Sequence, residues 1–151
     1  MGNRVCLTCA LLLALTECPS PRGPAYFVVS EPYPAHGDSY LLVLNEPDDI
    51  RHARRLTRDP FNTASPIVVA KIAPGSGNPV NEDFTGGGGP WSWHVTEFVE
   101  FADFTIEILD GWPGLVEQDV DSWIANTNGY IGFWSYTVTD ELAEDEVTFV
   151  P

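Results

Sequence analysis

Three residues near the middle of the chain carry the side chains that acid–base catalysis needs: His94, Glu107 and Asp110. A histidine beside a carboxylate can titrate near neutral pH and can therefore exchange protons under physiological conditions. His94 and Glu107 both stand between apolar residues in alternating stretches, so two adjacent strands would place them on one polar sheet face. The activity that fits such a group is hydrolysis of a polysaccharide.

No catalytic motif accompanies these residues. The patterns HExxH, GxSxG and the phosphate-binding P-loop are absent. The other histidines, His36 and His52, belong to different expected elements, so a zinc site is not predicted. The three cysteines, Cys6, Cys9 and Cys18, lie at the N-terminus and leave the rest of the chain without a thiol or a disulfide framework. A binding module is therefore favoured over an enzyme.

Two loops are the candidate contact surfaces of such a module. Trp112 stands in the turn Gly111-Trp112-Pro113-Gly114, where a tryptophan is expected to be exposed. The segment 74–90 is rich in glycine and proline and contains four consecutive glycines, 86–89. These loops predict a protein partner, and an inhibitor of an extracellular protease is one form that the module could take.

Four of the seven basic residues are spaced i, i+3, i+4 and i+7, which places them on one helix face. They are Arg51, Arg54, Arg55 and Arg58. A basic amphipathic helix is typical of calmodulin targets and anion sites. Calmodulin targets also carry large apolar anchors, which are few here. The alternative is that the arginines pair with carboxylates of the same domain.

The chain is strongly acidic, with 22 Asp and Glu against 7 Lys and Arg and a formal net charge of −15. Such a charge repels phosphate backbones, so nucleic acid is excluded as a partner. No cofactor is expected. Calcium is an alternative ligand of the acids at 140–146, but the DxDxDG loop pattern is missing.

The N-terminus resembles a secretory signal peptide. Arg4 precedes an apolar run, 5–15, that is too short to span a membrane and is followed by a proline-rich stretch. Leu15-Thr16-Glu17-Cys18 also resembles a lipoprotein signal, which would anchor Cys18 to lipid, although Glu17 stands where a small residue belongs. The sequence therefore predicts a signal peptide over 1–18, a linker over 19–25, one globular domain over 26–142 and an acidic extension over 143–151.

The apolar patterns predict an α+β domain. Helical spacing covers 45–59 and 115–125, and strand patterns cover 26–29, 39–44, 67–72, 91–95, 104–108 and 130–138. This order favours one mainly antiparallel sheet of about five to seven strands, with two helices in a single layer on one face.

Several segments carry a family resemblance: Trp91-Ser92-Trp93-His94, 101–111, Val116-Glu117, Phe133-Trp134-Ser135 and the helix 50–56. They resemble the N-terminal domain of a calmodulin-binding protein family of social amoebae, similar domains of which occur alone behind signal peptides in bacteria. The likeness covers 26–142 and implies the fold and secretion. It implies no catalytic residues, and calmodulin binding need not reside in this domain.

The resemblance also implies cysteines in relatives near the positions of Leu109 and of Gly132 or Phe133. Neither cysteine is present here. If those cysteines pair in the family, packing replaces the bridge in this chain.

Overall fold

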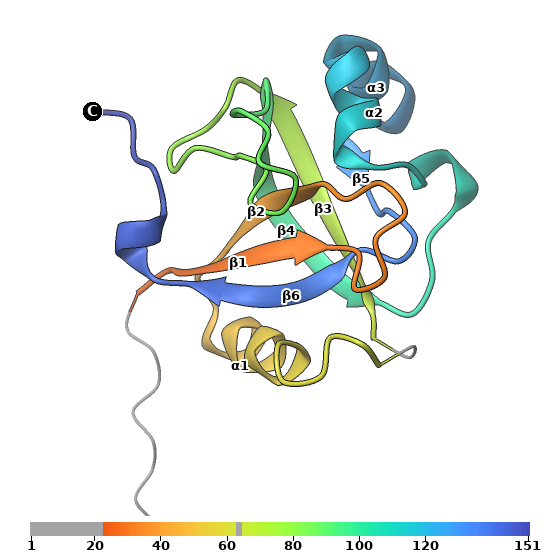
Figure 1. Ribbon diagram of the computed structural model, residues 1–151. Helices are drawn as coiled ribbons and strands as arrows, with labels where there is room; N and C mark the ends of the chain where they lie inside the picture. Colours follow the sequence, from red (N-terminus) through yellow and green to blue (C-terminus); the bar gives the residue numbers. More distant parts are fainter. Residues whose placement is uncertain (1–22, 63–64) are drawn as a thin grey trace, which may run out of the picture.

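The computed structural model describes residues 23–62 and 65–151 (Figure 1). The predicted signal peptide and most of the predicted linker lie outside these residues. Within them the chain forms six strands, three α-helices and two short 3-10 helices. No described helix is long and apolar enough to cross a membrane.

The first sheet has the strand order β2-β1-β6, and both pairs are antiparallel. Its strands are β1 (Ala25–Ser30), β2 (Ser39–Leu44) and β6 (Thr137–Leu142). All six positions of β1 are buried, as the central place of this strand requires. The predicted strands at 26–29 and 39–44 are confirmed.

The second sheet has the order β4-β3-β5 and is also antiparallel. It consists of β3 (Ile67–Pro74), β4 (Trp93–Ala102) and the short β5 (Tyr130–Ile131). The β-branched run at 67–69 is buried at the centre, and β4 continues well beyond the predicted 91–95. The two sheets share one core, in which Tyr40 and Phe27 of the first sheet join Trp93 of the second.

Helix α1 (Pro47–Leu56) turns Ile50 and Ala53 into this core. Proline at its start and two acids in its first turn fit a helix N-terminus, because proline needs no hydrogen-bond partner there and the acids complement the helix dipole. Helix α1 lies beside β6, whereas α2 (Pro113–Gln118) and α3 (Val120–Thr127) lie at the opposite end of the molecule (Figure 1).

The α+β class with antiparallel pairing is confirmed, but the single sheet of five to seven strands under two helices is wrong. Two three-stranded sheets and three helices are present in the described residues. The predicted helix 115–125 is divided at Asp119, whose backbone is not helical and whose carboxylate accepts a hydrogen bond from the Ser122 N–H at 3.0 Å. Asp119 thus ends α2 and caps α3.

Two strand predictions also need correction. The stretch 104–108 pairs with no strand and instead leads into the 3-10 helix η1 (Glu107–Leu109). The stretch 130–138 is divided between β5 and β6, which belong to different sheets, because the chain turns between them through Ser135 at a φ of +69°. Alternation of apolar residues records side-chain direction, but hydrogen bonding to a neighbour makes a strand.

The long loop between β3 and β4 is fixed to the edge of β2 by two side chains. Asn81 Oδ1 accepts a hydrogen bond from the Leu41 N–H at 2.8 Å, and Asp83 Oδ1 accepts one from the Ser39 N–H at 3.0 Å. Trp91 Nε1 donates to the Ser39 carbonyl at 2.9 Å. The segment 143–151 includes the 3-10 helix η2 (Glu144–Glu146) and returns to this loop, where the Val80 N–H donates to the Thr148 carbonyl at 2.7 Å.

Candidate functional site

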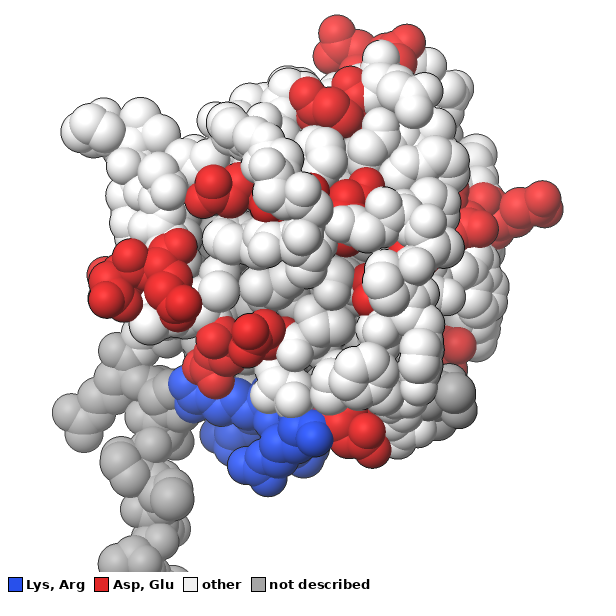
Figure 2. All heavy atoms as spheres, viewed as in Figure 1, with Lys and Arg blue, Asp and Glu red and all other residues white. Residues whose placement is uncertain are grey.

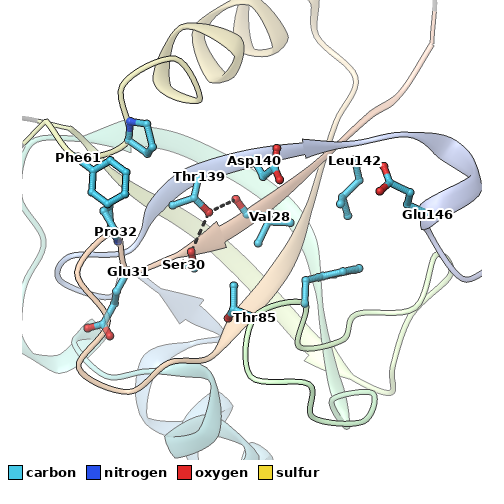
Figure 3. Close-up of a pocket in the computed structure, with 12 residues that line it drawn as sticks. Val28, Ser30, Glu31, Pro32, Phe61, Thr85, Thr139, Asp140, Leu142 and Glu146 are labelled. Carbon is cyan, nitrogen blue, oxygen red and sulfur yellow. Dashed lines mark hydrogen bonds between the residues drawn. The ribbon is translucent and has the colours of Figure 1, made fainter.

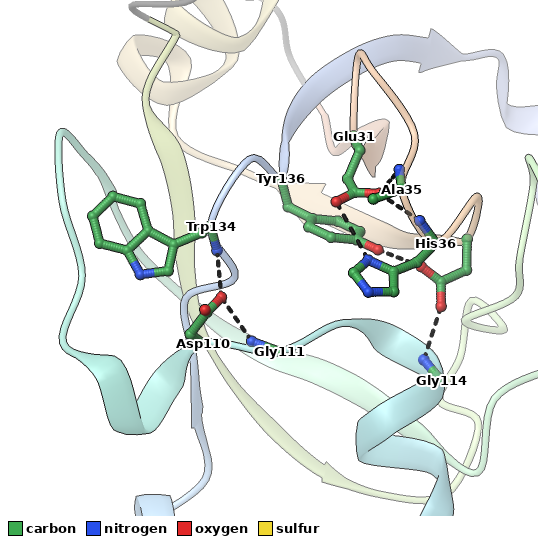
Figure 4. Close-up of polar contacts among 9 residues, drawn as sticks. Glu31, Ala35, His36, Asp110, Gly111, Gly114, Trp134 and Tyr136 are labelled. Carbon is green, nitrogen blue, oxygen red and sulfur yellow. Dashed lines mark hydrogen bonds and ion pairs between the residues drawn. The ribbon is translucent and has the colours of Figure 1, made fainter.

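His94, Glu107 and Asp110 have separate surroundings. His94 Nδ1 lies 2.6 Å from the Gly75 carbonyl oxygen. Glu107 begins η1 with an exposed side chain. Asp110 Oδ1 accepts hydrogen bonds from the Gly111 and Trp134 N–H groups at 2.9 and 3.1 Å (Figure 4). Within residues 23–62 and 65–151, no hydrogen bond or ion pair joins any two of the three, so the described contacts assemble no acid–base group.

Trp112 lies at the N-terminus of α2 and is half-buried against the main core. Its ring stacks on the ring of His36, with the centroids 4.2 Å apart and the planes at 8°. This contact ties the turn 111–114 to the β1–β2 loop, so one face of the predicted contact residue is already occupied by its own chain.

A polar cluster holds the same β1–β2 loop in place (Figure 4). The buried Glu31 carboxylate accepts hydrogen bonds from the Ala35 and His36 N–H groups at 2.7 and 2.9 Å, and His36 Nδ1 lies 3.4 Å from its other oxygen. Among the described residues, no serine, threonine or cysteine side chain hydrogen-bonds to His36. The pair therefore orients an imidazole but activates no nucleophile.

Asp38 joins this loop to two other elements. Its carboxylate accepts a hydrogen bond from the Gly114 N–H of α2 at 2.9 Å and another from the Tyr136 hydroxyl. Burial, together with this bond to a carboxylate, raises the pKa of Tyr136 far above its ordinary value. The phenol therefore stays protonated and acts as a donor that holds Asp38.

The arginine face predicted on α1 is present, and Figure 2 shows it as one blue area on a surface where the other charges in view are red. Arg51 pairs with Asp48 of the same helix, and Arg54 forms a two-pronged contact with Glu141 of β6 at 2.6–3.0 Å. Arg55 and Arg58 are exposed and make no ion pair with a described residue. Half of this face therefore serves pairing within the domain.

Arg54→Met is expected to lower the free energy of unfolding by about 1 kcal/mol or less, because the pair with Glu141 is partly exposed to solvent. Urea unfolding in low and high salt measures the effect, which should shrink as salt screens the wild-type pair. Arg55→Met, a matched change of an unpaired arginine on the same helix, should have a smaller effect. Equal losses for both variants would contradict the stabilising role of the pair.

A groove of about 560 Å³ crosses the outer face of the first sheet (Figure 3). Ser30 and Thr139 form its polar floor, and their hydroxyl oxygens lie 2.8 Å apart. Phe61 and Pro32 stand at one end, and Glu146 stands at the other (Figure 3). The two hydroxyls satisfy each other, and the described contacts provide no unpaired polar group on this floor for a ligand.

The segment before and within η1 forms an apolar surface that the strand prediction missed. Phe104, Ile106 and Ile108 are 73, 61 and 55 % exposed. With Val99 of β4 they surround a hollow of about 550 Å³, whose other walls come from β3, β5 and the end of α3. We call Val99, Phe104, Ile106 and Ile108 the η1 apolar patch. Large apolar side chains gathered around one hollow are typical of a surface that a partner covers.

The structure also bears on the metal hypothesis. Within the described ranges, no group of three or more His, Cys, Asp or Glu side chains is arranged to hold a metal ion. The carboxylate of Asp83, the most heavily hydrogen-bonded of the acids in the long loop, is surrounded by N–H and O–H donors. Such donors take the place that a cation would need.

The comparisons with known proteins agree with the resemblance stated above. The family model for the N-terminal domain of the calmodulin-binding protein family matches residues 23–145, a span that includes both sheets, the three α-helices and the η1 apolar patch. Comparisons with curated proteins and with solved structures gave no match. The match covers most of the chain, and the chain therefore belongs to the family of these calmodulin-binding-protein N-terminal domains.

Proposed function

We propose that this protein is a secreted, non-catalytic binding module that takes up a protein partner on its η1 apolar patch. The exposure of three large apolar side chains around one hollow carries the proposal. Burying each of them against a partner would contribute about 1.5–3 kcal/mol before the costs of association. Membership of the calmodulin-binding-protein N-terminal domain family hints at a binding role, and the N-terminal apolar run supports secretion.

The patch is a better contact surface than the loops at 74–90 and 110–114. Glycines 86–89 carry no side chain that could fill a pocket of a partner such as a protease, and Asn81 and Asp83 fix this loop to the domain itself. Trp112 is stacked on His36. A protease inhibitor remains one form of the proposal, with the η1 apolar patch as the surface that contacts the enzyme.

The test compares capture of proteins from the native extracellular medium by the wild-type chain and by the triple variant Phe104→Ser, Ile106→Ser, Ile108→Ser. The captured proteins are expected to fall at least about tenfold with the triple variant, because the apolar contact is lost. The control is Tyr33→Ser with Phe61→Ser, which removes an equally exposed aromatic pair elsewhere.

Circular dichroism and urea unfolding must show that both variants fold. Retained capture by the control together with loss in the triple variant supports the proposal. Capture of the same proteins in the same amounts by the wild-type chain and the triple variant overturns it.

A further inference from the structure

The η1 apolar patch continues into a second hollow. This hollow of about 470 Å³ is lined mainly by α2 and α3 and shares Ile108, Asn126 and Thr127 with the first. Ile108 therefore stands between two concave surfaces that follow the same helix, α3. Such an elongated shape fits a segment of a protein better than a compact small molecule.

The charges around this surface have one sign. Glu100 lines the first hollow and Asp119 lines the second, and no lysine, arginine or histidine lines either. Asp103, Glu107 and Asp110 alternate with or flank the apolar residues of the patch and are exposed. The apolar floor thus has a carboxylate rim.

The described basic residues do not neutralise this rim. Four of them are the arginines of α1, and the fifth is Lys71 of β3. Lys71 Nζ lies 5.1 Å from the ring centroid of Tyr130, a residue of the first hollow, but it is paired with Glu97 at 2.7 Å. The rim carboxylates therefore remain available to a partner.

We propose that the partner segment bound by the η1 apolar patch is cationic and amphipathic, with apolar side chains over Phe104, Ile106 and Ile108 and with lysine or arginine over the rim. The inference rests on the proposed function and adds the chemistry of the partner. Apolar burial supplies most of the affinity, whereas the opposite charges speed association and select against acidic segments. Binding should therefore weaken as salt rises.

Three fluorescently labelled peptides, each about 14 residues and so roughly 20 Å long as a helix, test the chemistry. One has a leucine face and a lysine face, the second replaces lysine by glutamate, and the third replaces leucine by serine. Fluorescence anisotropy with the full chain should give the lowest Kd for the leucine–lysine peptide. The other two should bind at least about tenfold more weakly, because each lacks one half of the match.

Two charge variants locate the contact. Glu107→Lys reverses an exposed acid of η1, and Asp145→Lys reverses an exposed acid of η2, the other 3-10 helix. The first should raise the Kd of the leucine–lysine peptide about five- to tenfold and flatten its salt dependence, whereas the second should change the Kd less than about twofold. Equal effects would show attraction by net charge alone and overturn the inference.

Ile106→Ser separates this inference from the proposed function. If the leucine–glutamate peptide binds as tightly as the leucine–lysine peptide and Ile106→Ser weakens both, the patch binds apolar segments but the cationic partner is wrong. If Ile106→Ser leaves the binding of the leucine–lysine peptide unchanged, both proposals fail. Absence of binding by every peptide, or a dimer of the chain that Ile106→Ser dissociates, overturns the cationic partner.

Discussion

Asp83→Ala is expected to lower the free energy of unfolding by about 3 kcal/mol, because the change leaves several buried donors without an acceptor. Asp83 Oδ1 accepts hydrogen bonds from the N–H and hydroxyl of Ser39, the N–H and hydroxyl of Thr85 and the Gly86 N–H, at 2.9–3.2 Å. Asp83 is itself buried. Urea unfolding followed by tryptophan fluorescence measures the loss, and Asp145→Ala, at an exposed carboxylate, should cost less than about 0.5 kcal/mol.

The same carboxylate makes the stability of the domain depend on pH. Burial raises the pKa of Asp83, but the hydrogen bonds from Gly86, Ser39, Thr85 and Gly88 together outweigh burial and hold this pKa below its ordinary value of 3.8. Because the folded pKa is the lower one, the stabilisation is present above the unfolded pKa and is lost as pH falls through the folded pKa.

Asp83→Asn should therefore reduce the dependence of stability on pH below about pH 4. The measurement is urea unfolding at a series of pH values, with wild type and variant compared at each. An acid dependence identical to that of the wild type, or an Asp83→Ala variant as stable as Asp145→Ala, would refute the role given to this carboxylate.

Leu109→Cys with Gly132→Cys is expected to form a disulfide under oxidising conditions and to stabilise the domain by about 3 kcal/mol, since it closes a loop of about 24 residues. A Cβ built on Gly132 lies 3.6 Å from the Cβ of Leu109, within the usual range for a disulfide. That new Cβ would also lie 2.7 Å from Thr105 Oγ1. This hydroxyl has no described hydrogen-bond partner, so it can rotate away without breaking a bond.

The disulfide is measured by thiol titration and by urea unfolding with and without reductant, in a chain whose three natural cysteines are serine. Leu109→Ser with Gly132→Ser measures the cost of the altered packing. Free thiols that persist after oxidation, or equal stability of the oxidised and reduced forms, would contradict the geometry. These are the positions near which the family resemblance implied cysteines, and the structure places them side by side.

Local patterns predicted the elements whose neighbours agree with them. The buried run of β1, the strand β2 and the proline-initiated α1 were all predictable, because burial, period and end signals coincide there. The division of the sheet was not, since the pairing partners of β4 and β6 are set by distant residues. Asp119 did carry a local signal, because an aspartate three residues before an N–H that it accepts is a preferred helix cap.

The candidate site was missed for a related reason. Phe104, Ile106 and Ile108 alternate with polar residues as a half-buried strand does, and the sequence alone does not show that their apolar side faces solvent. The separation of His94 from Glu107 follows from the same error, because it assumed that both stand on paired strands. The arginine spacing was informative, since it predicted a shared face and the alternative of internal pairing that Arg54 realises.

The side chains that hold the loop 75–92 to β2 also affect how copies of this protein meet one another. An unpaired strand edge offers its N–H groups to any neighbouring chain and can start edge-to-edge aggregation. At Ser39 and Leu41 those groups are already bonded to Asp83 and Asn81. Two short polar side chains thus do the work of a seventh strand, and they keep this edge closed to other copies of the chain at high protein concentration.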